Sequence, residues 1–396
     1  MYGYDDYSIG DKLPSIIIDL GCLYTKIGYS HETEPREIIK TINFIDYFSF
    51  YKNIIINYLG FIKSHSNSEN GNKQYKYLNI LDYIIDIDTK EFKNSLEEFV
   101  NDILFQHLQI PKKKRDKSFN CVLLTDKNPS FEKLYEMFSN QLMESNFFAN
   151  IVTLDSKITP IFCSGTTSGI VLNIGSINSS IMLIYNNFIK QSNIKEVDIS
   201  VFKLIEKLTV SIIHENFYKK QNKFKISTLA SLLSTINMND LLARLLICPN
   251  KSVVENFIED DINKYRLESN NIDISYKNEN GSINLNLSLL SRVNLIESMF
   301  DSCIKGDFEF SEKSNVVEYI IDLLTSCSSE VRNKVAQNVI LSGGVTNCIG
   351  LHKRLSDELK KSIQERDNLH LQSLLQRISV HKILYSRNCL SWIGCK

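Results

Sequence analysis

The chain has 396 residues, and its 45 Lys and Arg against 46 Asp and Glu give a formal net charge of −1. This balance excludes the strong long-range attraction to nucleic acid or anionic membranes that a basic protein shows. Hydrophobic residues make up 43% of the sequence and charged residues 23%, which is typical of a globular protein with a sizeable core. The length predicts one large two-lobed fold or roughly two to three domains.

The nine cysteines form no C-x-x-C pair, and none lies at zinc-ligand spacing from a histidine pair. Their odd number indicates a reducing compartment. Residues 1–19 lack the pattern of a signal peptide, and no stretch approaches the roughly 20 apolar residues of a membrane helix. We therefore expect an intracellular protein without direct membrane insertion. The basic run 112–115 predicts a solvated loop, with a nuclear import signal as the alternative.

The first half of the chain alternates short buried strands with amphipathic helices. The runs 15–20 (SIIIDL) and 120–125 (NCVLLT) are apolar and bounded by turn residues, which predicts buried strands. Residues 25–29 alternate weakly, as the second strand of a hairpin does. Helices are predicted at 89–108 and 130–143, because apolar residues recur there at helical spacing.

The second half repeats this plan. Strands are predicted at 169–174 and 181–185 around a glycine turn, which echoes the first hairpin and indicates a duplicated core. A third strand, 339–344, runs into another glycine turn. The order of elements predicts an α/β class with mixed sheets. Helices are predicted at 201–217, 228–246, 316–327 and 351–363, a surface loop at 64–73, and an irregular segment or hairpin at 268–284.

Three turns carry glycine directly after a strand: 19–23 (DLGCL), 173–177 (NIGSI) and 342–346 (SGGVT). Glycine lets the backbone turn sharply and lets N–H groups approach an anion. One such turn is weak evidence, but three in this order predict a shared site. Two facing hairpins would grip a triphosphate, and the third turn would hold the base or ribose.

The amino-acid sequences of these turns and their flanks resemble those of the actin superfamily. The resemblance is carried by SIIIDLGCLYTKIGYS, VLLTDKNPSFEKLYEMF, SGTTSGIVLNIGSINSSIMLIYNN, NVILSGGVTNCIGLHKRLSDEL and SWIGCK, about half of the chain. Hsp70 and sugar kinases share the fold but not SGTTSGIVL or LSGGVTNCIGLHKRL. The resemblance implies an actin-like two-lobed α/β fold with a nucleotide cleft between the lobes. The nucleotide, ATP or ADP, would contact Asp19, Gly21, Cys22, Leu23, Lys26, Gly175, Ser176, Gly343, Gly344 and Val345.

The resemblance also implies four subdomains. Subdomain 1 would comprise residues 1–40, 80–163 and 370–396. Residues 41–79 would form a divergent subdomain 2. Subdomain 3 would comprise 164–190 and 286–369, and 191–285 would form a divergent subdomain 4.

Several positions depart from an ATP-hydrolysing actin. Asn173 and Ser176 stand where the second loop of the family carries acids, and a hard cation prefers anionic oxygen, so bound Mg²⁺ is doubtful. Ser156 and Ser180 stand where a glutamine and a histidine position the attacking water, and serine is a poor base near neutral pH. We expect ATP hydrolysis to be slow or absent and predict no catalytic residue. Nucleotide bound without turnover would stabilise the fold, and an empty cleft is the alternative.

The divergence is uneven, because 41–77 and 190–285 match actin poorly while subdomains 1 and 3 match well. A protein that keeps only subdomains 1 and 3 can dock onto the pointed end of an actin filament without offering a template for a further actin. The chain most resembles the pointed-end actin-related proteins of dynactin, which implies a cytoplasmic, cytoskeletal subunit. Its partners would be the actin-like filament and the pointed-end subunits of dynactin, and indirectly dynein. The sequence stops after SWIGCK, where that family continues into a further helix.

Two other functions stay open at this stage. A nuclear actin-related subunit of a chromatin-remodelling complex would explain the basic run 112–115. A residual ATPase of the sugar-kinase or Hsp70 branch would need a carboxylate at the γ-phosphate, and the second loop offers none.

Overall fold

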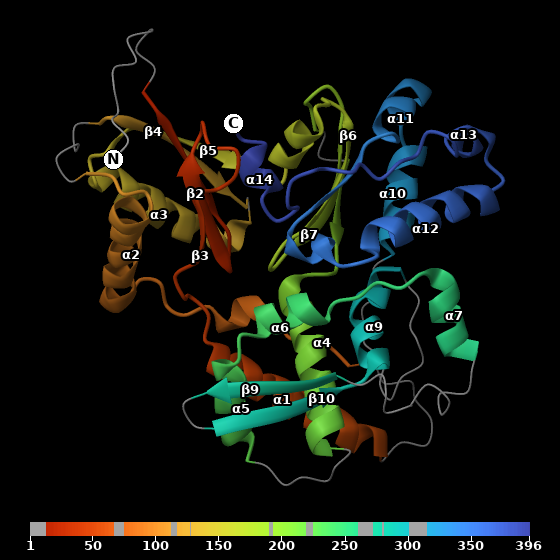
Figure 1. Ribbon diagram of the computed structural model, residues 1–396, viewed down its shortest axis with the longest axis horizontal. Helices are drawn as coiled ribbons and strands as arrows, with labels where there is room; N and C mark the ends of the chain where they lie inside the picture. Colours follow the sequence, from red (N-terminus) through yellow and green to blue (C-terminus); the bar gives the residue numbers. More distant parts are fainter. Residues whose placement is uncertain are drawn as a thin grey trace. The chain divides into compact units, whose positions relative to one another are not determined.

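The computed structural model describes residues 13–66, 75–111, 117–126, 128–189, 193–218, 225–259, 272–278, 281–300 and 315–396. Residues 112–115, most of 64–73 and parts of 268–284, for which the sequence makes predictions, lie outside these ranges. The chain divides into two compact units (Figure 1). Unit 1 comprises Met1–Asn43, Asp86–Pro160 and Ser391–Lys396, and unit 2 comprises Phe44–Ile85 and Ile161–Leu390.

Unit 1 is built on a five-stranded sheet with the order β3-β2-β1-β4-β5. β1 and β2 form an antiparallel hairpin in which Asp19 pairs with Lys26, and β4 and β5 continue the sheet parallel to β1. Apolar runs form β1 and β4, most of whose residues are buried, whereas β3 and much of β5 are not buried. Their bounds are β1 (Ser15–Leu20), β2 (Tyr24–Tyr29), β3 (Glu37–Lys40), β4 (Phe119–Thr125) and β5 (Phe148–Asp155).

Helices bury an apolar stripe against this sheet. The side chain of Thr89 accepts a hydrogen bond from Phe92 N at 3.2 Å and so caps the first of them. Trp392 is a core residue of this unit, since it is fully buried and its indole N–H donates to Ile17 O at 3.0 Å. The helical elements are α2 (Lys90–Asp102), η2 (Ile103–His107), η3 (Pro129–Phe131) and α3 (Glu132–Glu144).

Unit 2 repeats the same strand arrangement in a four-stranded sheet with the order β11-β6-β7-β8. β6 and β7 form an antiparallel hairpin, and β11 lies parallel to β6. A hairpin extended by a parallel strand on its first strand thus occurs once in each unit, as the internal echo in the sequence predicts. The bounds are β6 (Gly169–Ile174), β7 (Ser179–Ile184), β8 (Ile194–Val197) and β11 (Val339–Ser342).

Helices α1, α6 and α9 of unit 2 pack around α4 (Val201–Ile213), whose residues 204–213 are all buried. A helix that is buried on every side belongs to a core. A separate hairpin, β9 (Ile272–Asn278) and β10 (Gly281–Leu287), lies beside it in Figure 1. The segment η6 (His214–Tyr218) continues α4, and η4 (Thr159–Ser164) and α14 (Leu390–Ile393) lie where the chain passes from one unit to the other. The other helical elements are α1 (Tyr47–Ser66), η1 (Ile80–Tyr83), α5 (Ile226–Thr235), α6 (Met238–Leu245), α7 (Lys251–Glu259), α9 (Leu289–Glu297), η8 (Ser298–Phe300), α10 (Val316–Thr325), α11 (Ser329–Val335), η9 (Gly344–Asn347), α12 (Leu351–Glu365) and α13 (Leu369–Gln372).

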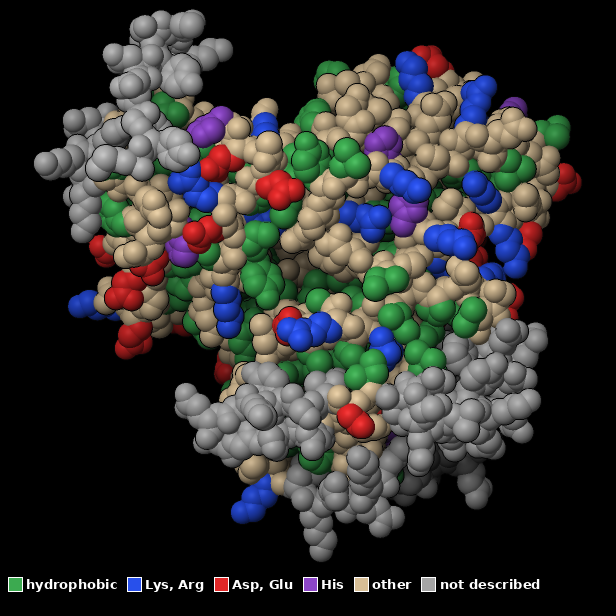
Figure 2. All heavy atoms as spheres, in the orientation of Figure 1, with side chains coloured by type: hydrophobic (Ala, Val, Ile, Leu, Met, Phe, Trp, Pro, Cys, Tyr) green, Lys and Arg blue, Asp and Glu red, His purple; other side chains and the backbone are tan. Residues whose placement is uncertain are grey.

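α12 shows the amphipathic pattern that the sequence predicts. Leu355 and Leu359 are buried, whereas Lys353 and Lys360 are exposed. Figure 2 shows Lys and Arg side chains over this part of unit 2 on the face in view. The helix therefore packs by one stripe and presents charge on the other.

Two sequence-based predictions of helices are wrong. The helix predicted at 228–246 is two helices, α5 and α6, because the side chain of Asn237 accepts a hydrogen bond from Asp240 N at 3.2 Å and starts a new helix. The 20-residue helix α1 was not predicted at all. Among the described residues, no helix is long and apolar enough to cross a membrane.

Candidate nucleotide-binding turns

The second and third glycine turns lie together in unit 2. They follow β6 and β11, which are parallel neighbours with Ser342 opposite Asn173. Gly343 has a φ of +98°, and a Cβ there would lie 2.1 Å from Ile174 O. Only glycine fits such a close approach between two backbones. The structure therefore brings two of the three turns together at the carboxyl ends of adjacent strands, where ligands of α/β sheets bind.

Both turns carry backbone N–H groups for which the described part of the chain offers no acceptor. Gly175 N donates to Asn178 O at 3.1 Å, but the N–H groups of Ser176 and Ile177 have no acceptor among the described residues. The N–H groups of Gly344 and Val345 likewise have none. The carbonyl oxygens of Gly175 and Ser176 accept from the first amides of α4, at 3.1 Å each, which fixes the turn. Unused N–H groups in a fixed turn suit an anion.

Two hydroxyl groups on β7 are buried beside the second turn. Ser179 and Ser180 are 2% and 3% exposed, and their Oγ atoms have no hydrogen-bond partner in the described part of the chain. Ser180 pairs with Asn173 across the hairpin. Buried polar groups normally have a partner, so these hydroxyls fit a site that takes a polar ligand.

The first turn lies in unit 1 and has the same construction. A Cβ at Gly21 would lie 2.6 Å from Tyr24 O, and Gly21 O accepts from Thr41 Oγ1 at 2.7 Å. The N–H groups of Cys22 and Leu23 have no acceptor among the described residues. Lys26 Nζ lies 2.6 Å from Asp19 Oδ2, with both side chains largely buried. The turn thus places an ammonium group and free N–H donors on one hairpin.

The residues present fit the phosphates of a nucleotide but not a divalent cation. Asp19 is the carboxylate of the first turn, and Lys26 neutralises it. The second turn has the neutral side chains of Asn173 and Ser176. In the described ranges, no group of three or more His, Cys, Asp or Glu side chains could hold a metal ion. Ser156 and Ser180 offer no general base for an attacking water.

Arg387 supports the third turn and was missed by sequence analysis. Its carbonyl oxygen accepts from Gly343 N at 3.0 Å, and its N–H donates to Asn347 Oδ1 at 3.3 Å. Its guanidinium group donates to Thr346 O. No local motif marks this role, because Arg387 reaches the turn from a segment that follows α13.

The thiol in the first turn is unsuited to nucleophilic chemistry. Burial, and secondarily the nearby Asp126 carboxylate, raise the pKa of Cys22 far above its ordinary value. The thiolate is the nucleophile, so a raised pKa makes a thiol inert. The same cause, burial, raises the pKa of Cys348 and of Cys395 to about 12.

We expect Cys348 and Cys395 to resist alkylation in the native protein. Raising a thiol pKa from 9.0 to about 12 lowers the thiolate fraction at pH 8 by about a thousandfold. Iodoacetamide at pH 8, followed by peptide mass spectrometry, should leave both residues unmodified in buffer and modify them in urea. Equal rates in buffer and urea would contradict the assignment of both thiols as protonated in the folded protein.

Comparison with known proteins identifies the family of the chain. A sequence model of the actin family matches residues 10–395, and the chain belongs to that family. It is an actin-related protein. It is 22% identical over 412 residues to Actin-related protein 10 of Dictyostelium discoideum, covering 97% of this chain and 82% of the relative. It is 20% identical over 388 residues to Putative actin-29 of the same organism, covering 96% and 88%.

Proposed function

We propose that this chain is a non-catalytic structural subunit that caps the pointed end of the actin-like filament of dynactin. In that role it would support dynein-driven transport in the cytoplasm. The similarity to Actin-related protein 10 supports an actin-related role. The observation that carries the capping role is the placement of residues 44–85, which contain most of the segment 41–79 that the resemblance to actin assigns to subdomain 2.

This segment is bound to α4 and is part of unit 2. The hydroxyl of Tyr75 donates to Glu206 Oε1 at 2.7 Å, and Leu78 N donates to Glu206 Oε2 at 3.1 Å. Tyr58 Oη and His214 Nδ1 lie 2.6 Å apart. All of these side chains except that of Leu78 are buried. Burial raises the pKa of Tyr75, so its hydroxyl stays protonated and donates.

Apolar packing along α1 strengthens this attachment. Ile54 and Ile55 are fully buried, and each such side chain contributes roughly 1.5–3 kcal/mol when it leaves water. The rings of Tyr47 and Phe50 pack on Phe202 of α4, with centroids 6.4 and 6.1 Å apart. A segment held in this way cannot serve as a free inter-subunit loop. A cap needs an outer face that offers no such loop to a further subunit.

The cap would bind nucleotide without turning it over. The three turns supply N–H donors and Lys26, whereas Ser156 and Ser180 supply no base. A ligand that binds only the folded state stabilises it by mass action, without chemistry. ATP or ADP would therefore act here as a structural component.

Replacing Tyr75 by phenylalanine should loosen α1. The variant removes one donor from the buried Glu206 carboxylate, and this should lower the free energy of unfolding by about 1–3 kcal/mol. Hydrogen exchange of the amides in Tyr47–Ser66 should accelerate accordingly. Tyr185→Phe is the matched control, because the Tyr185 hydroxyl bonds Glu330 at the surface, and we expect a change of at most about 0.5 kcal/mol. Unchanged exchange in Tyr75→Phe would contradict the fixed attachment.

The partner set tests the proposed function directly. Affinity purification of the tagged chain from its own cells, followed by mass spectrometry, should recover the actin-like filament subunit and the pointed-end subunits of dynactin. Recovery of chromatin-remodelling ATPases without dynactin subunits would favour the nuclear alternative and reject the cap.

A further inference from the structure

The second turn offers donors to an anion but no anionic oxygen to a cation. Asn173 and Ser176 are neutral, and the N–H groups of Ser176 and Ile177 have no acceptor among the described residues. The Ser179 and Ser180 hydroxyls are buried and unpartnered within the same ranges. A divalent cation needs several oxygen ligands, at least some of them charged. The turn is therefore built for phosphate alone.

The first turn has a carboxylate, but a lysine already occupies it. Asp19 is 4% exposed, and Lys26 Nζ lies 2.6 Å from its Oδ2. A hard cation would have to displace this ammonium group from a buried carboxylate. A phosphate could instead share Lys26 and accept from the free N–H groups of Cys22 and Leu23.

The charges of the three turns, taken one at a time, favour an anion that carries no metal. Asp19 and Lys26 sum to zero in the first turn, the nearby Asp126 carboxylate is paired with Lys157, and the second turn is neutral. In the third turn the guanidinium group of Arg387 contributes +1, and it bonds a backbone carbonyl oxygen, that of Thr346. None of the turns presents net negative charge that a divalent cation would offset.

We propose that the second and third turns, which lie together in unit 2, bind the phosphates of a nucleoside polyphosphate in its metal-free form, so that Mg²⁺ weakens binding. Chelation by Mg²⁺ removes two negative charges from the ligand and occupies phosphate oxygens that the N–H groups of these turns would otherwise take. This inference rests on the nucleotide-binding part of the proposed function. A site with acids in its second loop would bind the magnesium complex of the nucleotide more tightly than the metal-free form, and here we expect the opposite order.

Titration calorimetry of the full chain with ATP tests the proposal. At constant ionic strength, ATP in EDTA should bind at least about fivefold more tightly than ATP in excess Mg²⁺. The double variant Asn173→Asp with Ser176→Asp should reverse this order, since it adds two anionic oxygens that a cation can bridge to phosphate. Ser329→Asp with Asn333→Asp on α11 adds the same charge away from the turns and should keep the original order. Tripolyphosphate, tested in parallel, should bind with the same Mg²⁺ dependence but more weakly, since it lacks the nucleoside.

The possible outcomes distinguish a failure of this inference from a failure of the proposed function. Tighter binding of the magnesium complex by the unmodified chain would overturn the inference and leave nucleotide binding standing. No binding of ATP in either form would overturn both the inference and the nucleotide-binding part of the function, while the capping role would still be decided by its partners. An unchanged order in Asn173→Asp with Ser176→Asp would overturn the role given to the second turn.

Discussion

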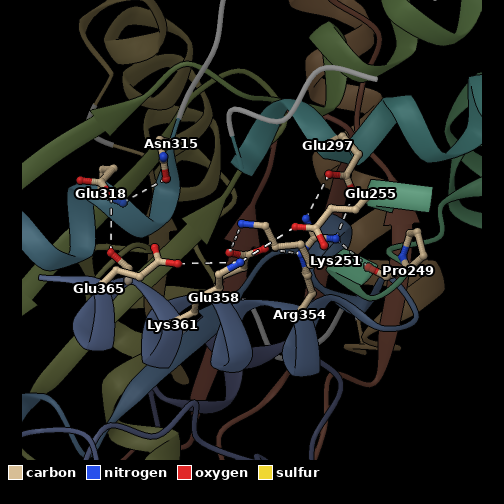
Figure 3. A network of polar contacts seen from close by, with 11 residues as sticks. Pro249, Lys251, Glu255, Glu297, Asn315, Glu318, Arg354, Glu358, Lys361 and Glu365 are labelled. Carbon is tan, nitrogen blue, oxygen red and sulfur yellow. Dashed lines mark hydrogen bonds and ion pairs between the residues drawn. The ribbon is translucent and has the colours of Figure 1, made fainter. Parts of the chain in front are cut away.

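Replacing Arg354 by methionine should lower the free energy of unfolding by about 3–5 kcal/mol. Arg354 and Glu297 are each 1% exposed, and their side chains meet at 3.2 Å. Arg354 Nε also donates to Glu358 Oε1 at 2.8 Å, and Nη1 donates to Pro249 O at 2.9 Å. Figure 3 shows this network joining α12 to α9 and to the segment before α7. Removing the cation takes away the ion pair that Arg354 makes with the buried Glu297 carboxylate, which is the main source of the loss.

Urea denaturation of Arg354→Met measures this loss of stability, and two further variants test its cause. Arg244→Met removes an exposed pair, Arg244–Asp240 at 2.9 Å, and should change stability by less than about 0.5 kcal/mol. Arg354→Met combined with Glu297→Met removes both buried charges and should recover at least half of the loss, because an apolar pair of similar volume needs no solvation. A loss in Arg354→Met no larger than in Arg244→Met would contradict the buried network.

Gly343→Ala should be the most damaging small substitution in the candidate site. The residue has a φ of +98°, which costs an L-residue about 1–3 kcal/mol. Its new Cβ would lie 2.1 Å from Ile174 O, and relieving such a contact costs about another 1–3 kcal/mol. The free energy of unfolding should therefore fall by roughly 2–6 kcal/mol, measured by urea denaturation.

Gly344→Ala is the matched control for this prediction. It makes the same chemical change one residue later, where a Cβ would have nothing within 4 Å and φ is not positive. We expect a change of at most about 0.5 kcal/mol. Equal losses in the two variants would contradict the close approach of the second and third turns.

The strands that carry the three glycine turns, and the turns themselves, could be predicted from sequence for a physical reason. A short strand buried on both faces must be apolar throughout, and the chain must turn immediately after it. SIIIDLG, GIVLNIG and VILSGG satisfy both conditions within seven residues or fewer. The parallel neighbours β6 and β11 then bring Gly175 and Gly343 together, because carboxyl ends of parallel strands share an edge.

Features that depend on distant partners could not be predicted in this way. The helix α1 mixes aromatic and aliphatic residues with scattered polar ones, and its anchor Tyr58 bonds His214, 156 residues away. Arg354 lies in α12, a helix with many charged residues, yet two of its partners lie on α9 and beside α7. Local periodicity contains no information about such pairs. The break between α5 and α6 was missed for a different reason, since one capping residue, Asn237, overrides a continuous apolar pattern.

Cross-linking mass spectrometry of the purified complex tests the capping role most directly. If the chain caps a pointed end, lysines of the regions that resemble subdomains 1 and 3, such as Lys334 on α11, should link to the last filament subunit. The exposed Lys52 on α1 should link to other pointed-end subunits and not to the filament. Links from Lys52 to the filament, with none from the subdomain 1 and 3 regions, would contradict the account.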